Sequence, residues 1–141
     1  MNYLIDDNLI FVNLDPGDSI MEELTLIAVK NKIESGWISG IGAIRDPEVG
    51  MYYLINKVYE KKIFKGNYEL LSFQGNISIK DNKQFIHAHI IFSDSEYNSF
   101  GGHLFQTCIS VAGEFIIHKG NKNLNRKYNR EVGLPLWCIK K

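Results

Sequence analysis

The chain has 141 residues and a mass of 16.2 kDa, which predicts a single domain over residues 1–141 that folds without disulfide staples. Its 16 basic and 16 acidic side chains balance, so the net positive charge typical of a dedicated nucleic-acid binder is absent. The opening residues, MNYLIDDNLIF, are acidic where a secretory signal is basic, and no apolar run approaches the roughly 20 residues that span a bilayer. We therefore expect a cytoplasmic protein with no membrane partner.

After an opening strand, the sequence predicts one helix over about residues 19–34. It begins with Ser19-x-x-Glu22, a capping-box pattern that also places Glu22 and Glu23 at the positive end of the helix dipole. Gly36 follows as a stop. The apolar positions are spaced as on one helical face that packs on a sheet, namely Ile20, Leu24, Ile27 and Ala28.

Most of the remaining sequence has the composition and alternation of β-strands. One helix among many strands, connected mostly by short turns, predicts an α+β fold. We expect a mostly antiparallel sheet of about seven strands with the helix packed on one face. The predicted strands cover residues 9–14, 37–44, 50–56, 58–65, 68–79, 85–92 and 103–118.

Two features that elsewhere mark cofactors or cross-links have simpler interpretations here. The G-x-G of SGIGAI, residues 39–44, lacks the third glycine of a dinucleotide fingerprint and runs into a strand, so it predicts a bulge or close backbone packing. Cys108 and Cys138 form no C-x-x-C pair, and we expect both to be small buried hydrophobic residues.

The stretch IHAHIIFSDSEYNSFGGHL contains three of the four histidines. Because alternate strand residues share a face, His87 and His89 project side by side, and a turn through residues 98–102 would bring back His103. Three imidazoles with one open position match a catalytic-type zinc site, although nickel, copper or iron suit the same ligands. The opposite face of the strand is an apolar row that belongs in the core, formed by Ile86, Ala88, Ile90 and Phe92.

Other interpretations of the histidines remain open. They would serve equally as hydrogen-bonding groups in a polar interface. Cupins also present H-x-H from a strand, but here Ser93 and Asp94 stand where a cupin has its glutamate. The fourth histidine, His118, lies beside Lys119 at the end of a strand and is expected on the surface.

The order of ISGIGAI, YELLSFQGNIS, HAHIIFSD and FGGHL resembles that of the plant and prokaryote conserved (PPC) domain. The similarity runs from PGDSIMEELTLIA to YNREVGLPLW, over nearly the whole chain. The resemblance implies an antiparallel sheet of about seven strands with a packed helix, assembled as a homotrimer. It also implies a metal held by His87, His89 and His103, as in some prokaryotic members of the family.

Family members are commonly described as DNA-binding proteins, but in plants the attached AT-hook, Arg-Gly-Arg-Pro, enters the minor groove. That element is absent here, which makes the chain resemble a stand-alone prokaryotic member. Only the basic segment KGNKNLNRKYNR is left to contact phosphates, and such a segment is usually solvated surface. Its basic residues are Lys119, Lys122, Arg126, Lys127 and Arg130.

Three functional classes follow from these patterns. The first is a trimer that binds a small-molecule ligand or a partner and holds a structural or sensing metal, and the second is a DNA-binding regulator. The third is a small zinc-dependent hydrolase or lyase, in which zinc lowers the pKa of bound water towards about 7. It needs a proton-transfer partner, for which Asp94, Glu69 and Glu114 are candidates, although the two glutamates would equally pair with a cation such as Arg45.

Overall fold

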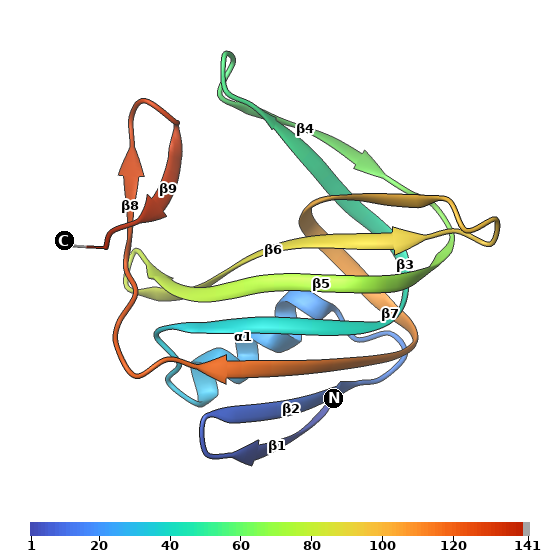
Figure 1. The fold of residues 1–141 in the computed structure, drawn as a ribbon, viewed down its shortest axis with the longest axis horizontal. Helices are drawn as coiled ribbons and strands as arrows, with labels where there is room; N and C mark the ends of the chain where they lie inside the picture. Colours follow the sequence, from blue (N-terminus) through green and yellow to red (C-terminus); the bar gives the residue numbers. More distant parts are fainter. Residues whose placement is uncertain (140–141) are drawn as a thin grey trace.

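Nine strands and one helix make up residues 1–139, the part of the chain that this computed structural model describes (Figure 1). The last two residues of the predicted domain lie outside the described part. The elements are β1 (Asn2–Asp6), β2 (Leu9–Leu14), α1 (Ile20–Lys30), β3 (Gly36–Tyr53), β4 (Val58–Ile63), β5 (Asn67–Lys80), β6 (Lys83–Ser93), β7 (Ser99–Lys119), β8 (Arg126–Asn129) and β9 (Leu134–Trp137).

Seven strands form one antiparallel sheet in the order β1-β2-β7-β6-β5-β3-β4, with an additional pairing between β7 and β3. Because β5 and β7 each pair with both β3 and β6, these four strands close on one another. The long strand β7 therefore bends around the sheet in Figure 1. The predicted α+β class with a seven-stranded, antiparallel sheet and one packed helix is confirmed.

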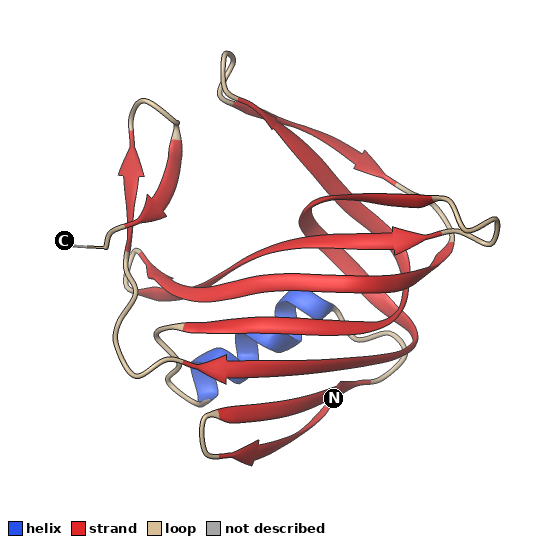
Figure 2. Cartoon of the chain, in the orientation of Figure 1, coloured by secondary structure: helices blue, strands red, loops and turns tan. Residues whose placement is uncertain are grey.

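The helix α1 lies across one side of the sheet (Figure 2) and buries its predicted apolar face completely. The four predicted contact residues are 0% exposed, and they pack against the buried side chains of the sheet. With 11 residues α1 is short, and no helix in residues 1–139 has the length and apolarity needed to cross a bilayer.

The ends of α1 differ from the prediction. Ser19 is the N-cap residue, but its side chain makes no capping hydrogen bond, so the capping box is not formed. The helix ends at Lys30 rather than near residue 34, because the backbone of Lys32 adopts a left-handed conformation with φ 51°, which a right-handed helix cannot contain. The Asn31 side-chain amide donates to the carbonyl oxygen of Ile27 at 2.9 Å, beside the backbone N–H of Asn31.

The G-x-G motif lies in a bulge of β3, as predicted. The register of β3 against β5 shifts between Gly40 and Gly42. A Cβ atom at Gly40 would collide with the Phe115 ring and would lie 2.8 Å from the Glu114 carbonyl oxygen, so close strand packing requires glycine there. The cysteines are free as expected, but Cys108 and Cys138 are half-buried rather than fully buried.

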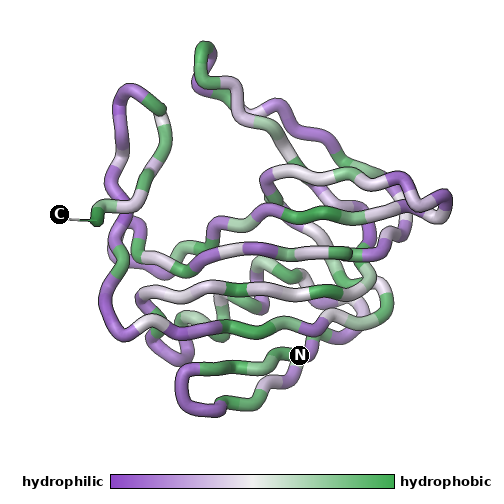
Figure 3. Tube along the Cα trace, viewed as in Figure 1, coloured by the Kyte–Doolittle hydropathy of each residue, from purple (hydrophilic) through white to green (hydrophobic). Residues whose placement is uncertain are grey.

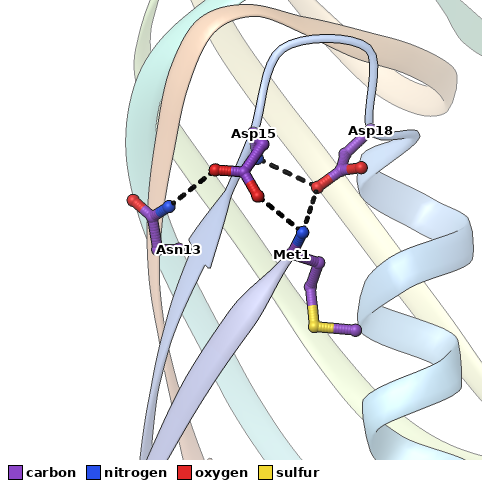
Figure 4. A network of polar contacts seen from close by, with 4 residues as sticks. All are labelled: Met1, Asn13, Asp15 and Asp18. Carbon is purple, nitrogen blue, oxygen red and sulfur yellow. Dashed lines mark hydrogen bonds and ion pairs between the residues drawn. The ribbon is translucent and has the colours of Figure 1, made fainter.

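A polar network connects β1 to the turn that leads into α1 (Figure 4). The Met1 ammonium lies 2.7 Å from a carboxylate oxygen of Asp15 and 3.0 Å from one of Asp18. The backbone N–H of Asp15 donates to Asp18, and this bond together with the Met1 ammonium lowers the pKa of the Asp18 carboxyl. The network anchors the start of the edge strand β1, a strand that was not predicted from the sequence.

The β3–β4 hairpin of the main sheet contacts the β8–β9 hairpin, which forms a separate two-stranded sheet. The Tyr52 hydroxyl of β3 donates to the carbonyl oxygen of Val132, and the Lys57 ammonium donates to that of Arg130, both at 2.6 Å. The β8–β9 hairpin is thereby held against the β3–β4 hairpin. Figure 3 shows hydrophobic residues at the tip of the β3–β4 hairpin, where Ile55 is 95% exposed.

Candidate metal centre

Three histidines meet where β6 pairs with β7. His87 and His89 project from the same face of β6, and His103 on β7 is the direct cross-strand partner of His89. The other face of β6 is buried in the core, as the alternation predicted. The glycine pair before His103 lies within β7 rather than in a turn. Close strand packing requires glycine there, because a Cβ atom at Gly101 would lie 2.6 Å from the Ile90 carbonyl oxygen.

The prediction that these imidazoles converge is confirmed by their geometry. One ligand nitrogen from each of the three side chains lies within 4.8 Å of the other two. The ring centroids are 5.1 Å apart for His87 and His89, 5.0 Å for His87 and His103, and 5.4 Å for His89 and His103. His118, in contrast, is exposed at the end of β7, as expected.

The electrostatics of the cluster keep two of its imidazoles neutral. Burial lowers the pKa of His87 to about 4, with further contributions from the charges of His89 and Arg126. Burial likewise lowers the pKa of His103 to about 4, with contributions from His87, His89 and Lys61. At neutral pH both side chains therefore offer unprotonated nitrogen lone pairs, the form that binds a metal.

Aromatic side chains hold the His103 imidazole in place. The Tyr59 ring packs on it with a centroid distance of 4.7 Å and an interplanar angle of 32°, and the Phe105 ring lies 4.9 Å away. The Nδ1 atom of His103 is buried without a hydrogen-bond partner among the described residues. Because a buried polar nitrogen without a partner is costly, this atom fits a site in which the imidazole interacts with a group from outside the chain.

Two cations lie beside the histidines. The guanidinium of Arg126 donates to the side-chain oxygen of Asn76 at 2.9 Å, and Asn76 is the cross-strand partner of His87. The Lys61 ammonium lies 3.7 Å from the centroid of the Phe105 ring, which packs on His103. Arg126 belongs to the basic segment that was predicted to be solvated surface, but its side chain is half-buried against the sheet.

Residues 2–121 match the Plants and Prokaryotes Conserved (PCC) domain, the family called PPC above. The chain belongs to this family. No curated protein sequence matches the chain.

Solved structures of related proteins share the PPC fold over nearly their full length. A "putative DNA binding protein" from Bacteroides thetaiotaomicron has a TM-score of 0.94 and 29% identity, covering 97% of this chain and 96% of that one. A PPC protein from Pyrococcus horikoshii has a TM-score of 0.88 and 31% identity, covering 99% and 96%. A metal-containing protein from Archaeoglobus fulgidus has a TM-score of 0.86 and 29% identity, covering 98% and 97%.

The carboxylates nominated for proton transfer lie elsewhere in this PPC domain. Asp94 holds the turn after β6 by accepting two backbone N–H bonds at 2.9 Å, and it lines a cavity of about 290 Å³ together with Glu69. Glu114 lines a groove over β2, β3 and β7. Within residues 1–139, neither Glu69 nor Glu114 forms an ion pair with Arg45, with a nitrogen–oxygen distance of 4.0 Å or less.

The cavity that adjoins the histidines is surrounded by a different set of side chains, which were not predicted from the sequence. This cavity, of about 470 Å³, is lined by His89 and His103 together with aromatic residues of the β3–β4 hairpin. Its acidic lining residue is Glu60. The alternation of β4 in the sequence gave no sign that this strand folds towards the H-x-H strand. The aromatic lining residues are Tyr52, Tyr53, Tyr59 and Phe64.

Proposed function

We propose that this PPC-domain protein forms a homotrimer in which each chain binds one zinc ion through His87, His89 and His103, and that the metal centre binds a small ligand or a partner. The observation that carries the metal is the convergence of three nitrogen donors within 4.8 Å, two of them neutral because their pKa is about 4. Three neutral imidazoles with a further open position are a common zinc ligand set.

The choice of zinc rests on the ligand chemistry. Imidazole nitrogen suits zinc, copper, nickel and iron, and a set of three without carboxylate or thiolate is typical of zinc centres that keep an open position. The Archaeoglobus protein, which is similar over 98% of this chain, is described as metal-containing, and this supports a metal in the family. When bound, zinc would supply a Lewis acid at the open position.

The homotrimer is supported by an apolar surface on the open face of the sheet, the side that α1 does not cover. A groove of about 870 Å³ lies there, and four large apolar side chains around it are between 41% and 67% exposed. Contiguous exposed apolar surface of this kind marks an interface. These side chains are Leu4, Phe11, Ile41 and Leu71.

The apolar surface and the histidines share this open face. Phe11, beside the groove, pairs directly with Ile116 on β7, and Ile116 pairs with Ser39 on β3. Ser39 in turn pairs with Gln74 on β5, and Gln74 pairs with His89 on β6. Because directly opposite residues on paired strands project from the same face, assembly through this surface would bring a neighbouring subunit close to the metal centre. This arrangement agrees with a site that binds a ligand within an oligomer.

A competition titration tests the metal centre. Purified protein stripped with a chelator is titrated with zinc in the presence of a chromophoric chelator, and light scattering gives its mass. We expect one zinc per chain and a mass three times 16.2 kDa. His87→Ala and His103→Ala should abolish tight binding, whereas His118→Ala, which removes an exposed imidazole, should leave it unchanged. Equal binding by all four proteins would refute the site.

A DNA-binding regulator is the second candidate, supported by the description of the Bacteroides protein, which is 29% identical to this chain. The segment 119–130 supplies basic side chains for it. Arg126 of this segment is half-buried and hydrogen-bonded to Ser78. The exposed cations of the segment are Lys122, Lys127 and Arg130. Fluorescence anisotropy with duplex DNA at several salt concentrations tests this role, since each phosphate contact adds about 0.9 to the salt slope. Absent or salt-insensitive binding would exclude it.

A further inference from the structure

The metal centre of the proposed function contains no protein carboxylate. Among residues 1–139, the three histidines lie within metal-binding distance of one another, and no cysteine or acidic side chain joins them. A divalent ion on three neutral imidazoles keeps its full double charge. Such a charge at a partly buried site favours an anion in the open position, because burial strengthens the attraction between opposite charges.

Arg126 adds a second uncompensated positive charge beside the first. The guanidinium donates to the Ser78 hydroxyl at 2.7 Å and to the Pro135 carbonyl and Asn76 side-chain oxygens at 2.9 Å, all of which are neutral acceptors. No carboxylate of residues 1–139 lies within 4.0 Å of it. Burial lowers its pKa, as expected for a cation that lacks a counter-ion.

The pairing of β5 with β6 shows that Arg126 lies on the same face of the sheet as the histidines. Its Asn76 partner projects from the same face as the opposite residue, His87, so the guanidinium lies next to the histidine cluster on that face. Three of its five N–H groups are used in the contacts above, which leaves two for an external acceptor. A planar guanidinium with two free donors matches a carboxylate.

The cavity that adjoins His89 and His103 is suited to an apolar group. It has a volume of about 470 Å³, within the range of small-molecule sites. Four aromatic side chains and Met51 line it alongside His89 and His103, and the two charged residues of its lining, Glu60 and Lys62, are of opposite sign. An inorganic anion would leave these rings without contact. An anionic group attached to an aromatic or aliphatic body would use both the charge and the cavity.

We propose that the metal-loaded centre binds a small organic carboxylate, with the carboxylate at the open metal position on the side of Arg126 and the apolar body in the cavity lined by Tyr59. This inference rests on the proposed metal site, since the carboxylate binds to the ion. It assigns the ligand class that the three histidines alone leave open.

Cobalt(II) in place of zinc makes the test visible, because the absorption spectrum of cobalt reports its coordination. Cobalt-loaded protein is titrated with acetate, benzoate, benzamide and inorganic phosphate. We expect saturable spectral changes with both carboxylates, about tenfold tighter binding of benzoate than of acetate, and no change with benzamide. Tighter binding of phosphate than of benzoate would overturn the assignment to a carboxylate.

Charge-removing variants test the role of Arg126. Arg126→Gln should weaken benzoate binding about tenfold while retaining one cobalt per chain, whereas Lys127→Gln, which removes the exposed charge next to it, should match the wild type. Lys61→Gln removes a cation that is 46% exposed, so folding should be preserved, and we expect a smaller loss of affinity. Unchanged benzoate affinity in Arg126→Gln and Lys61→Gln would overturn the proposal.

Failure of the metal site and failure of the ligand assignment give different results. If the protein takes up no cobalt, the proposed function fails and the carboxylate site fails with it. If cobalt binds to the histidines but no anion alters its spectrum, the metal site is upheld and the carboxylate proposal is refuted.

Discussion

Protonation of the histidine cluster should destabilise the metal-free protein as the pH falls. In the folded chain the pKa of His103 is about 4, compared with an ordinary value of 6.5. Between these values the unfolded chain binds the proton and the folded chain does not. The contribution of this group to stability is therefore fully present above pH 6.5 and is lost as the pH falls towards 4.

The size of the effect follows from the two pKa values. At about pH 4.5 the unfolded imidazole is almost fully protonated and the folded one mostly neutral, so the proton stabilises the unfolded state by about 2.5 kcal/mol. His103→Phe removes the titrating group but retains a ring for Tyr59 and Phe105 to pack against. We expect the variant to lose about 2.5 kcal/mol less stability than the wild type on acidification.

Urea unfolding of both proteins at pH values of about 7 and 4.5, with chelator present, measures the difference. Carboxyl groups and His87 also titrate in this range, but they are the same in both proteins and cancel in the comparison. Equal losses of unfolding free energy in the wild type and His103→Phe would show that His103 does not resist protonation, and would refute the pKa argument.

Two further predictions concern the groups around the centre, and a third concerns the bulge of β3. Tyr59→Ala should weaken zinc binding in the competition titration more than Tyr59→Phe, because the ring that orients His103 is removed in the first variant and kept in the second. Arg126→Ala should cost about 1–3 kcal/mol in urea unfolding, since it leaves two buried acceptors on β5 unpaired, and Lys127→Ala should cost under about 0.5 kcal/mol. Gly40→Ala should cost about 1–3 kcal/mol or prevent folding, because β7 leaves no space for a Cβ atom, and wild-type stability would contradict the bulge.

The histidine cluster was predictable because it depends on local rules. Strand alternation places His87 and His89 on one face, and the short connection between β6 and β7 makes these strands antiparallel neighbours, which brings back His103. The turn was predicted too late in the sequence. The glycine pair suggested it, but the side chain of Asp94 forms it earlier and the glycines serve strand packing.

The rest of the surroundings depends on long-range packing that the sequence does not display. Asp46 and Pro47 look like a break between two strands, yet the chain continues through them as β3, so its distal half reaches the histidines. Contacts between strand residues far apart in sequence place Tyr59 on His103. Arg126 looked like surface charge because nothing local reveals that the chain returns to β5 after residue 121.

Elemental analysis of untagged protein, purified without chelator, tests the central claim most directly. We predict about one zinc per chain in the wild type and in His118→Ala, and none above background in His87→Ala or His103→Ala, with all four proteins folded. Wild-type protein that contains no transition metal and takes up none when zinc is added would contradict the metal centre.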